Sequence, residues 1–261
     1  MGNREIRDIR PNEYNRVLQF IKKDNARNYF IRLGLEGDKD VYKRIIGEVD
    51  ESNNLKALLF KRKSGNLQFY GETGYNVEGF SKHISHMEFK SLISPSSYCD
   101  NFLNRGLFAS YKEGAFIGKL SKENKIDRED NIECIKKLTV DDLDNIVKLY
   151  KKVFNGFTSK EIMKEKLKTK RGRGYCIYHN KELISVAQSE FEDNDSAVVV
   201  GVATDPKFQK KGLASKCLKI LSNELQNEDK DIYLQYDNKD AGKIYEKLGF
   251  IVVDRVRHYF K

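Results

Sequence analysis

The chain has 261 residues, with 48 Lys and Arg against 39 Asp and Glu, and a formal net charge of +9. Hydrophobic residues make up 39% and aromatic residues 11%, which is enough to build hydrophobic cores and excludes a disordered chain. The longest apolar stretch, residues 197–203, is far shorter than the roughly 18 residues that cross a bilayer. This composition predicts one large or two small globular domains with no membrane span.

Each half of the chain opens with the same pattern. Ile6 and Ile9 precede apolar residues at helical spacing, and so do Ile132, Ile135 and Leu138 in the second half. The two helical faces contain Tyr14, Val17, Leu18 and Ile21, and then Leu143, Ile146, Val147, Tyr150 and Val153. A β-hairpin follows in each half, over residues 55–70 and 175–191. This repetition predicts an internal duplication.

Residues 121–131 contain one apolar residue and are typical of an exposed linker. We therefore place a domain boundary near residue 128, between a first domain of residues 1–128 and a second of residues 129–261. After the hairpins the halves diverge. The first half shows nothing that corresponds to the glycine-containing loop of the second, and its residues 91–119 indicate only mixed α and β structure.

The basic residues are spread along the chain. Residues 1–128 contain 23 basic and 17 acidic residues, and residues 129–261 contain 25 and 22. The densest clusters, residues 61–63 and 168–173, lie beside turn residues and are typical of solvated loops. We therefore expect no nucleic-acid partner, while attraction for an anionic small molecule stays open.

The termini and cysteines indicate the compartment. The N-terminus is charged and has no apolar signal segment, which predicts a cytoplasmic protein. The cysteines form no Cys-x-x-Cys pair, and His83 and His86 with Cys99 give no complete zinc spacing. We therefore expect no metal and four free thiols: Cys99, Cys134, Cys176 and Cys217.

The second half continues with a strand over residues 197–204, which Asp205 and Pro206 end. A lysine-rich loop then leads into a helix with an apolar face formed by Leu213, Cys217, Leu218, Leu221 and Leu225. A strand over residues 231–236, a second helix, and strand-like segments at 250–253 and 256–260 complete the chain.

The loop before this helix is a candidate phosphate cradle. Gly212 and Ala214 let an anion approach the backbone N–H groups of the helix N-terminus, and Lys210 and Lys211 add positive charge. An ordinary tight connection between a strand and a helix has the same appearance.

Two motifs resemble the GNAT superfamily of N-acetyltransferases. Residues 209–214, Gln-Lys-Lys-Gly-Leu-Ala, match the Gln/Arg-x-x-Gly-x-Gly/Ala acyl-CoA loop, and residues 232–250 look like the family's second motif, ending in Glu-Lys-Leu-Gly-Phe. The resemblance covers residues 132–261 well and the first half only in outline. It implies an α/β fold with two GNAT-like domains in tandem, each a mixed sheet flanked by helices, of which the first is non-catalytic.

The resemblance also implies acetyl-CoA as the acyl donor. The pyrophosphate would be held by the backbone N–H groups of Gln209, Lys210, Lys211, Gly212, Leu213, Ala214 and Ser215. The pantetheine arm would pair with the strand that carries Val202, Ala203 and Thr204, where two parallel strands part. The N–H near Val202 would polarise the thioester carbonyl.

The same resemblance suggests the catalytic groups. Tyr245 matches the position of the family's general acid. A phenol stays protonated at neutral pH and can donate its proton to a thiolate. A core aromatic has the same spacing. Asn238 would bind the cofactor or a water molecule, and it also suits a helix N-cap. Glu190 is our candidate base, with Glu192 as the other possibility; alternation places both on one face, and exposed surface glutamates are the alternative.

We therefore expect an N-acetyltransferase that moves an acetyl group from acetyl-CoA to a primary amine of a small molecule or peptide by direct attack. A catalytically silent CoA-binding regulatory module is the alternative, and a nucleic-acid-binding protein is a third possibility. The first domain would wall the acceptor cleft or mediate a homodimer. The sequence does not identify the acceptor.

Overall fold

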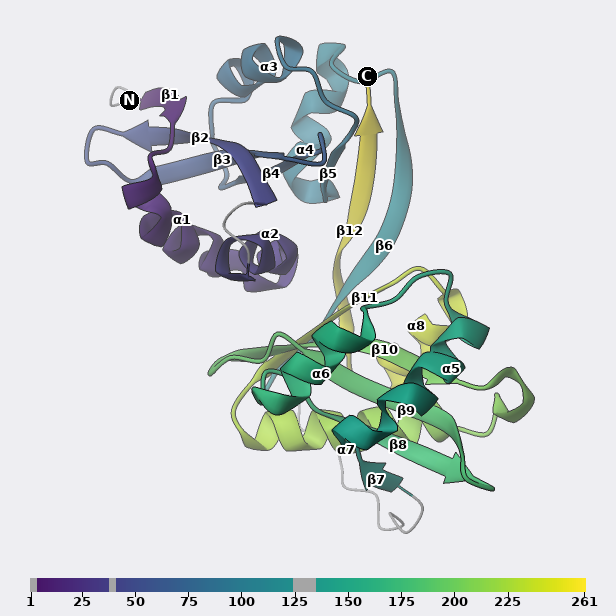
Figure 1. Cartoon of the computed structure of the whole chain (residues 1–261). Coiled ribbons are helices and arrows are strands. Elements are labelled where there is room, and N and C mark those ends of the chain that lie inside the picture. The colour runs from purple at the N-terminus through teal and green to yellow at the C-terminus, as the bar shows by residue number, and fades with distance from the viewer. Residues whose placement is uncertain (1–3, 38–40, 124–134) are drawn as a thin grey trace. The chain divides into compact units, whose positions relative to one another are not determined.

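The computed structural model describes residues 4–37, 41–123 and 135–261. The chain divides into two compact units: unit 1 comprises residues 1–117 and 252–261, and unit 2 comprises residues 118–251. Both contain a mixed sheet with helices packed on it, so the predicted α/β class is confirmed (Figure 1). The predicted boundary near residue 128 lies outside the described residues. Residues 252–261, which we assigned to the second domain, cluster with unit 1.

Unit 1 has a sheet in the order β1-β2-β3-β4-β5-β12-β6, in which β4 and β5 are parallel. Its strands are β1 (Arg4–Asp8), β2 (Tyr42–Asp50), β3 (Leu55–Arg62), β4 (Leu67–Gly71), β5 (Leu92–Pro95), β6 (Ser110–Leu120) and β12 (Ile251–Phe260). Its helices are η1 (Pro11–Glu13), α1 (Tyr14–Ile21), η2 (Lys22–Asp24), α2 (Asn25–Gly37), α3 (Val77–Ser85), α4 (Ser96–Cys99) and η4 (Asp100–Arg105).

The core of unit 1 is rich in aromatic side chains. The Phe69 ring lies edge-on to Phe80 and to Phe102, with centroids 5.1 Å apart in each pair. Val17 and Ile21, from the predicted apolar face of α1, are fully buried in the same cluster. The C-terminal strand contributes Tyr259, which is also fully buried there. Unit 1 is therefore built from both ends of the described chain.

Unit 2 has the sheet order β11-β10-β9-β8-β7, and the last residues of β6 lie beside β11. Within unit 2, β10 and β11 pair in parallel, and the other strand pairs with a described register are antiparallel. The strands are β7 (Ile135–Lys137), β8 (Gly174–His179), β9 (Glu182–Glu190), β10 (Ser196–Thr204) and β11 (Asp231–Tyr236). The helices are η5 (Val140–Asp142), α5 (Leu143–Val153), α6 (Lys160–Lys168), η6 (Pro206–Phe208), α7 (Leu213–Asn227) and α8 (Lys239–Lys247).

Two hydrophobic clusters stabilise this sheet. The predicted apolar stripe of α7 packs in one of them, where Cys217, Leu218, Leu221 and Leu225 are fully buried. The other cluster contains Leu143, Ile146 and Leu149 of α5 with Met163 of α6. A capping box at Thr139 and Asp142 precedes α5. The helices thereby hold β9 and β10 between two packed layers (Figure 1).

The element order of unit 1 repeats in unit 2: strand, two helices, three strands, helix, strand, helix. Our alignment of the hairpins was wrong by one strand, because β2 was not predicted: residues 55–70 form β3 and β4, which correspond to β9 and β10. Unit 1 also has a connection at the position of the glycine-containing loop, over residues 72–76 between β4 and α3. It is short and contains no lysine.

None of the described helices is long and apolar enough to span a membrane.

Candidate active site

A β-bulge interrupts β10 in the middle of the candidate site. Val200 lies opposite Gln188 on β9, and Ala203 lies opposite Val186. Two residues of β10, Gly201 and Val202, therefore face the single residue between those partners. Gly201 has a φ of +60°, which an L side chain adopts only with strain. The bulge turns the peptide groups of β10 out of the regular ladder at the position predicted to bind the acyl group.

The strands β10 and β11 part before this bulge. Their parallel pairing runs from Ser196 opposite Asp231 to Val199 opposite Leu234 and extends no further. The predicted cofactor-binding residues Val202, Ala203 and Thr204 follow the last pair. Backbone N–H and C=O groups on this side of β10 are thus available to an extended ligand.

The helix that follows begins without a side-chain cap. Gly212 is its N-cap residue with a φ of +72°, and a Cβ there would have no atom within 4 Å. The first helical hydrogen bond joins Lys216 N to Gly212 O at 3.0 Å. The N–H groups of Leu213, Ala214 and Ser215 therefore have no partner within the helix. An open helix N-terminus with this geometry suits an anionic ligand.

Asp205 fixes the loop that leads to this helix. Its N–H donates to Ile184 O at 2.8 Å, and its buried carboxylate pairs with Lys152 Nζ at 2.7 Å. The Gln209 amide donates to Thr204 O at 3.3 Å. Lys210 and Lys211 are exposed, and Lys210 has a φ of +62°. These exposed cations beside uncapped amides fit the phosphates of an acyl-CoA.

The two predicted residues of α8 lie in different surroundings. Asn238 is exposed and caps the helix, accepting from Asp240 N at 2.8 Å, so the N-cap interpretation is confirmed. Tyr245 is buried against Tyr236 and Phe250, with ring centroids 5.1 and 5.9 Å away. Burial raises the pKa of Tyr245 to about 12. Tyr245 belongs to the hydrophobic cluster of unit 2, so the core-aromatic alternative describes its ring. No described residue forms a hydrogen bond with its hydroxyl.

Glu190 ends β9 and is only 4% exposed. It lies opposite Val198 of β10, and its Oε2 pairs with Lys166 Nζ of α6. The other carboxylate oxygen, Oε1, is buried and has no hydrogen-bond partner among the described residues. A buried carboxylate oxygen without a partner is costly unless a ligand or water molecule binds it.

Glu192 lies in different surroundings, and the exposed-surface alternative is wrong for both glutamates. Phe191 has a φ of +58°, which breaks the alternation that placed both glutamates on one face. Glu192 pairs with Arg173 at 2.6 Å and with Lys230 at 3.4 Å. Neither glutamate is exposed, and each forms an ion pair with a largely buried cation. Glu192 therefore belongs to a structural ion network.

The sequence did not single out two further polar residues at the bulge. The Tyr150 hydroxyl of α5 donates to Gly201 O at 2.8 Å and accepts from Gln188 Nε2 at 2.6 Å. Tyr150 had been counted only among the apolar residues of a helix. Its hydroxyl contact requires knowledge of which strand α5 covers, and the periodicity of α5 contains no such signal.

The described cysteines are buried thiols. Burial raises the pKa of Cys217 and of Cys176 to about 12, which is unsuited to a nucleophile. Cys99 is fully buried in unit 1, and Cys134 lies outside the described residues. Across residues 4–37, 41–123 and 135–261, no three His, Cys, Asp or Glu side chains gather in a way that could hold a metal ion.

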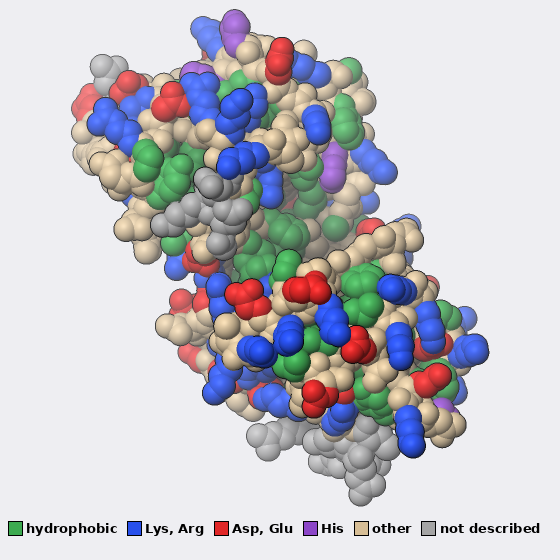
Figure 2. All heavy atoms as spheres, in the orientation of Figure 1, with side chains coloured by type: hydrophobic (Ala, Val, Ile, Leu, Met, Phe, Trp, Pro, Cys, Tyr) green, Lys and Arg blue, Asp and Glu red, His purple; other side chains and the backbone are tan. Residues whose placement is uncertain are grey.

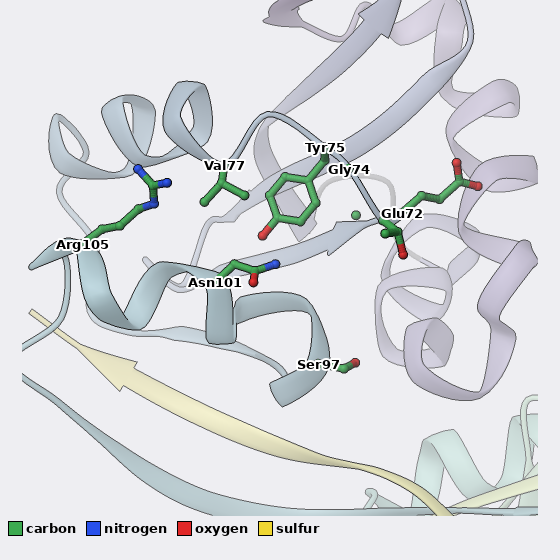
Figure 3. A pocket seen from close by; sticks show the side chains of 9 residues that line it. Glu72, Gly74, Tyr75, Val77, Ser97, Asn101 and Arg105 are labelled. Atoms are coloured by element: carbon green, nitrogen blue, oxygen red, sulfur yellow. The ribbon is translucent and has the colours of Figure 1, made fainter.

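Unit 1 contains a cavity of about 300 Å³ (Figure 3). It lies between residues 71–77 and the helices α4 and η4. In the element order, residues 72–76 correspond to the loop before α7 of unit 2, and α4 with η4 corresponds to α8. Figure 3 shows Tyr75 and Asn101 facing each other, while the Arg105 guanidinium turns toward α3, where it pairs with Glu78. This lining contains no lysine and does not reproduce the cationic loop of unit 2.

The surface charge is mixed. On the face that Figure 2 shows, Lys and Arg side chains are interspersed with Asp and Glu. Ion pairs among the described residues include Arg44 with Asp8 and Lys137 with Glu224. This distribution agrees with the scattered basic excess of the sequence.

Comparisons with known proteins agree with this geometry. The family model "GNAT acetyltransferase" matches residues 49–259. A solved GNAT-family acetyltransferase from Colwellia psychrerythraea superposes with a TM-score of 0.65 at 15% identity, covering 98% of this chain and 100% of that one. A tandem GNAT protein from the clavulanic acid biosynthesis pathway gives a TM-score of 0.61 at 10% identity, covering 99% and 98%.

A curated relative matches a shorter segment. The catalytic subunit NAA20 of the N-terminal acetyltransferase B complex of Arabidopsis thaliana is 33% identical over 66 residues. The match spans 24% of this chain and 38% of that protein. The structural likenesses show a shared fold, and the family model covers most of the chain. The chain belongs to the GNAT acetyltransferase family.

Proposed function

We propose that this protein transfers an acetyl group from acetyl-CoA to a primary amine of a small molecule or peptide. The observation that supports this most directly is the parting of β10 from β11 beside the bulge at Gly201 and Val202, followed by the uncapped N-terminus of α7. An extended arm suits the first feature and a pyrophosphate the second. The exposed Lys210 and Lys211 complement the negative charge of such a donor.

Acetyl-CoA, as a co-substrate, supplies the thioester. The backbone of residues 209–215 would hold its phosphates, and residues 202–204 would pair with the pantetheine arm. The Val202 N–H would donate to the carbonyl oxygen as negative charge develops there, the role that main-chain donors have in oxyanion holes.

Direct attack then needs two proton transfers. The amine nitrogen forms the new N–C bond, and the C–S bond breaks with its electron pair remaining on sulfur. Glu190, directly or through a water molecule at its partnerless Oε1, takes the proton from the amine. Tyr245 donates its proton to the thiolate. Burial raises the pKa of this phenol to about 12, so Tyr245 carries the proton it would donate at neutral pH.

We propose two classes of amine acceptor. The Arabidopsis relative is the catalytic subunit of an N-terminal acetyltransferase complex, which makes the α-amine of a peptide one class to test. The primary amine of a small molecule is the other class. Thiol release from acetyl-CoA with panels of both kinds of amine distinguishes them.

The test of this function is acetyl-CoA binding by calorimetry on the full chain. Gly212→Asp places a side chain and a negative charge in the open space at the start of α7, so we expect at least a ten-fold loss of affinity. Gly106→Asp is the matched control, because Gly106 also has a positive φ, +65°, and no atom near its missing Cβ. The control suffers the same backbone strain and should bind acetyl-CoA like the parent.

Each result has a definite meaning. Equal binding by the parent and by both variants would remove the α7 N-terminus from the site. No binding by the parent would overturn the function. Binding without transfer to any amine would instead support a silent CoA-binding module.

A further inference from the structure

We propose that Tyr150 is a positioning residue that aims the Val202 N–H by holding the carbonyl of the same peptide group. The inference rests on the proposed function, since it concerns how the acyl carbonyl would be polarised. The donor itself, the Val202 N–H, belongs to the main chain, and the inference adds a side chain that holds it in place. Its evidence is the geometry of Tyr150, Gln188 and the Gly201–Val202 peptide.

The peptide group transmits the position of one end to the other. A trans peptide is planar, and its C=O and N–H point in opposite directions. The Gly201 carbonyl and the Val202 N–H belong to one such plane. When the Tyr150 hydroxyl holds Gly201 O at 2.8 Å, the Val202 N–H is fixed in the direction away from Tyr150.

Without such a contact, a bulge would be the least constrained part of β10. Gly201 and Val202 lie where two residues face one on β9, so regular ladder pairing does not fix them. Gly201 also has the largest conformational freedom of any residue type. A hydrogen bond from a rigid side chain restricts this peptide plane to one orientation.

The surroundings make the Tyr150 hydroxyl a one-directional donor. Gln188 Nε2 donates to the phenol oxygen at 2.6 Å, so the phenol proton is directed at Gly201 O. Tyr150 is 1% exposed and Gln188 is 4% exposed, so water does not compete for these groups. Burial also raises the pKa of Tyr150, which keeps its proton in place.

The glycine at position 201 fits this arrangement. A Cβ there would lie 1.9 Å from the Tyr150 hydroxyl oxygen, a distance at which both cannot be present. The phenol ring is itself fixed by Phe154 and Phe157, whose centroids lie 5.1 and 5.4 Å away. Gly201, Tyr150 and Gln188 thus form one hydrogen-bonded cluster at the bulge.

The first test replaces Tyr150 by phenylalanine. Tyr150→Phe removes the hydroxyl and keeps the ring, so we expect kcat to fall about ten-fold, since a misdirected oxyanion donor loses part of its effect. The KM and Kd for acetyl-CoA should stay within two-fold. Tyr178→Phe is the matched control, because its hydroxyl also donates one bond, to Asp142, and accepts one, from Asn145. The control should keep kcat within two-fold.

A spectroscopic readout separates positioning from stability. The infrared carbonyl stretch of bound acetyl-CoA labelled with ¹³C at the acetyl carbonyl reports its polarisation. We expect a shift to lower frequency in the parent and in Tyr178→Phe, and a smaller shift in Tyr150→Phe. A merely structural role would leave this frequency unchanged in the molecules that remain folded.

A second variant protects the test from a failure to fold. Gln188→Leu leaves the Tyr150 phenol in place but removes the donor that orients its proton, so kcat should fall less than in Tyr150→Phe. An unchanged kcat and carbonyl frequency in Tyr150→Phe, or in Gln188→Leu where the first variant does not fold, would overturn the positioning role. A parent that shows no acetyl-CoA binding or transfer would instead overturn the proposed function.

Discussion

The Nζ of Lys166 on α6 pairs with Glu190 Oε2 at the end of β9, in an ion pair whose side chains are 14% and 5% exposed. The Lys166 ammonium also lies 3.7 Å from the centre of the Phe191 ring. This pair leaves Glu190 Oε1 as the carboxylate oxygen without a partner among the described residues. The lysine thus fixes the carboxylate so that Oε2 is held in the ion pair and Oε1 is buried without a partner among the described residues.

Glu190→Gln keeps the volume of the side chain and removes the proposed base. We expect kcat to fall about 100-fold near pH 7, as is typical when general base catalysis is lost. Acetyl-CoA affinity should stay within two-fold, because the carboxylate is not part of the cofactor loop. Steady-state kinetics and calorimetry check both values. A kcat within three-fold of the parent would show that another group takes the amine proton.

Glu192→Gln is the natural contrast two residues away. Glu192 is buried between Arg173 and Lys230, while Arg173 retains Glu228 and Glu224 as partners. We expect the free energy of unfolding to fall by about 2–3 kcal/mol, since a buried ion pair is broken but its cation is still partly compensated. Urea denaturation measures this loss. In the folded state at 20 °C kcat should stay within three-fold, and a large loss of turnover without a loss of stability would contradict the structural role.

Tyr245→Phe tests the proposed acid. The ring contacts with Tyr236 and Phe250 remain, so the fold and acetyl-CoA affinity should be preserved. We expect kcat to fall by a factor of about 100, because the thiolate must then be protonated by water. In the parent, a Tyr245 pKa of about 12 also predicts no loss of kcat from its ionisation between pH 8 and 10. Tyr175→Phe, which loses a hydroxyl contact to Glu224, is the control.

Glu13 predicts a pH dependence of stability. Its bonds to Arg7, together with the Arg10 N–H, lower the pKa of Glu13 to about 2. Because the folded value lies below the usual value of 4.5, the stabilisation is present above about pH 4.5 and is lost as the pH falls toward 2. Glu13→Gln should lower the free energy of unfolding by roughly 1–2 kcal/mol at pH 7, after allowance for solvent screening.

The difference between the parent and Glu13→Gln should shrink between pH 5 and pH 3. Urea denaturation at pH 7, 5 and 3, followed by circular dichroism, measures it. Glu165→Gln, which changes an exposed glutamate of α6, is the control for the loss of one surface charge. A constant difference across this range would mean that the Glu13 charge does not contribute.

Local patterns were sufficient for much of unit 2. Strand β11 has the predicted bounds, and the apolar stripe of α7 repeats at helical spacing from a fixed N-terminus at Gly212. The helix α7 is predictable because one of its faces is buried and the other meets solvent. Strand β11 is instead a short run whose consecutive residues Ile232, Tyr233 and Leu234 are all buried. The capping residues Thr139 and Asn238 mark their helices directly in the sequence.

Strand β2 was missed because its apolar residues do not alternate with polar ones and one of its buried residues is charged. Lys43 and Arg44 interrupt its apolar residues, and the fully buried Glu48 is compensated by Arg4 and by the Asn76 N–H from distant segments. The same reason explains why the burial of Glu190 and the hydroxyl contacts of Tyr150 were not predicted. A polar group that is satisfied across the fold leaves no mark in its own stretch of sequence.

The return of β12 to unit 1 has a consequence for biosynthesis. Its Asp254 accepts hydrogen bonds from Ser96 and Arg27, and its Tyr259 fills the core of unit 1. Residues 252–261 leave the ribosome only after all of unit 2 has been translated. Unit 1 is therefore translated first, but its sheet stays incomplete until residues 252–261 have been synthesised. Until then β12 does not cover the edge of β5, and an uncovered strand edge can pair with another chain.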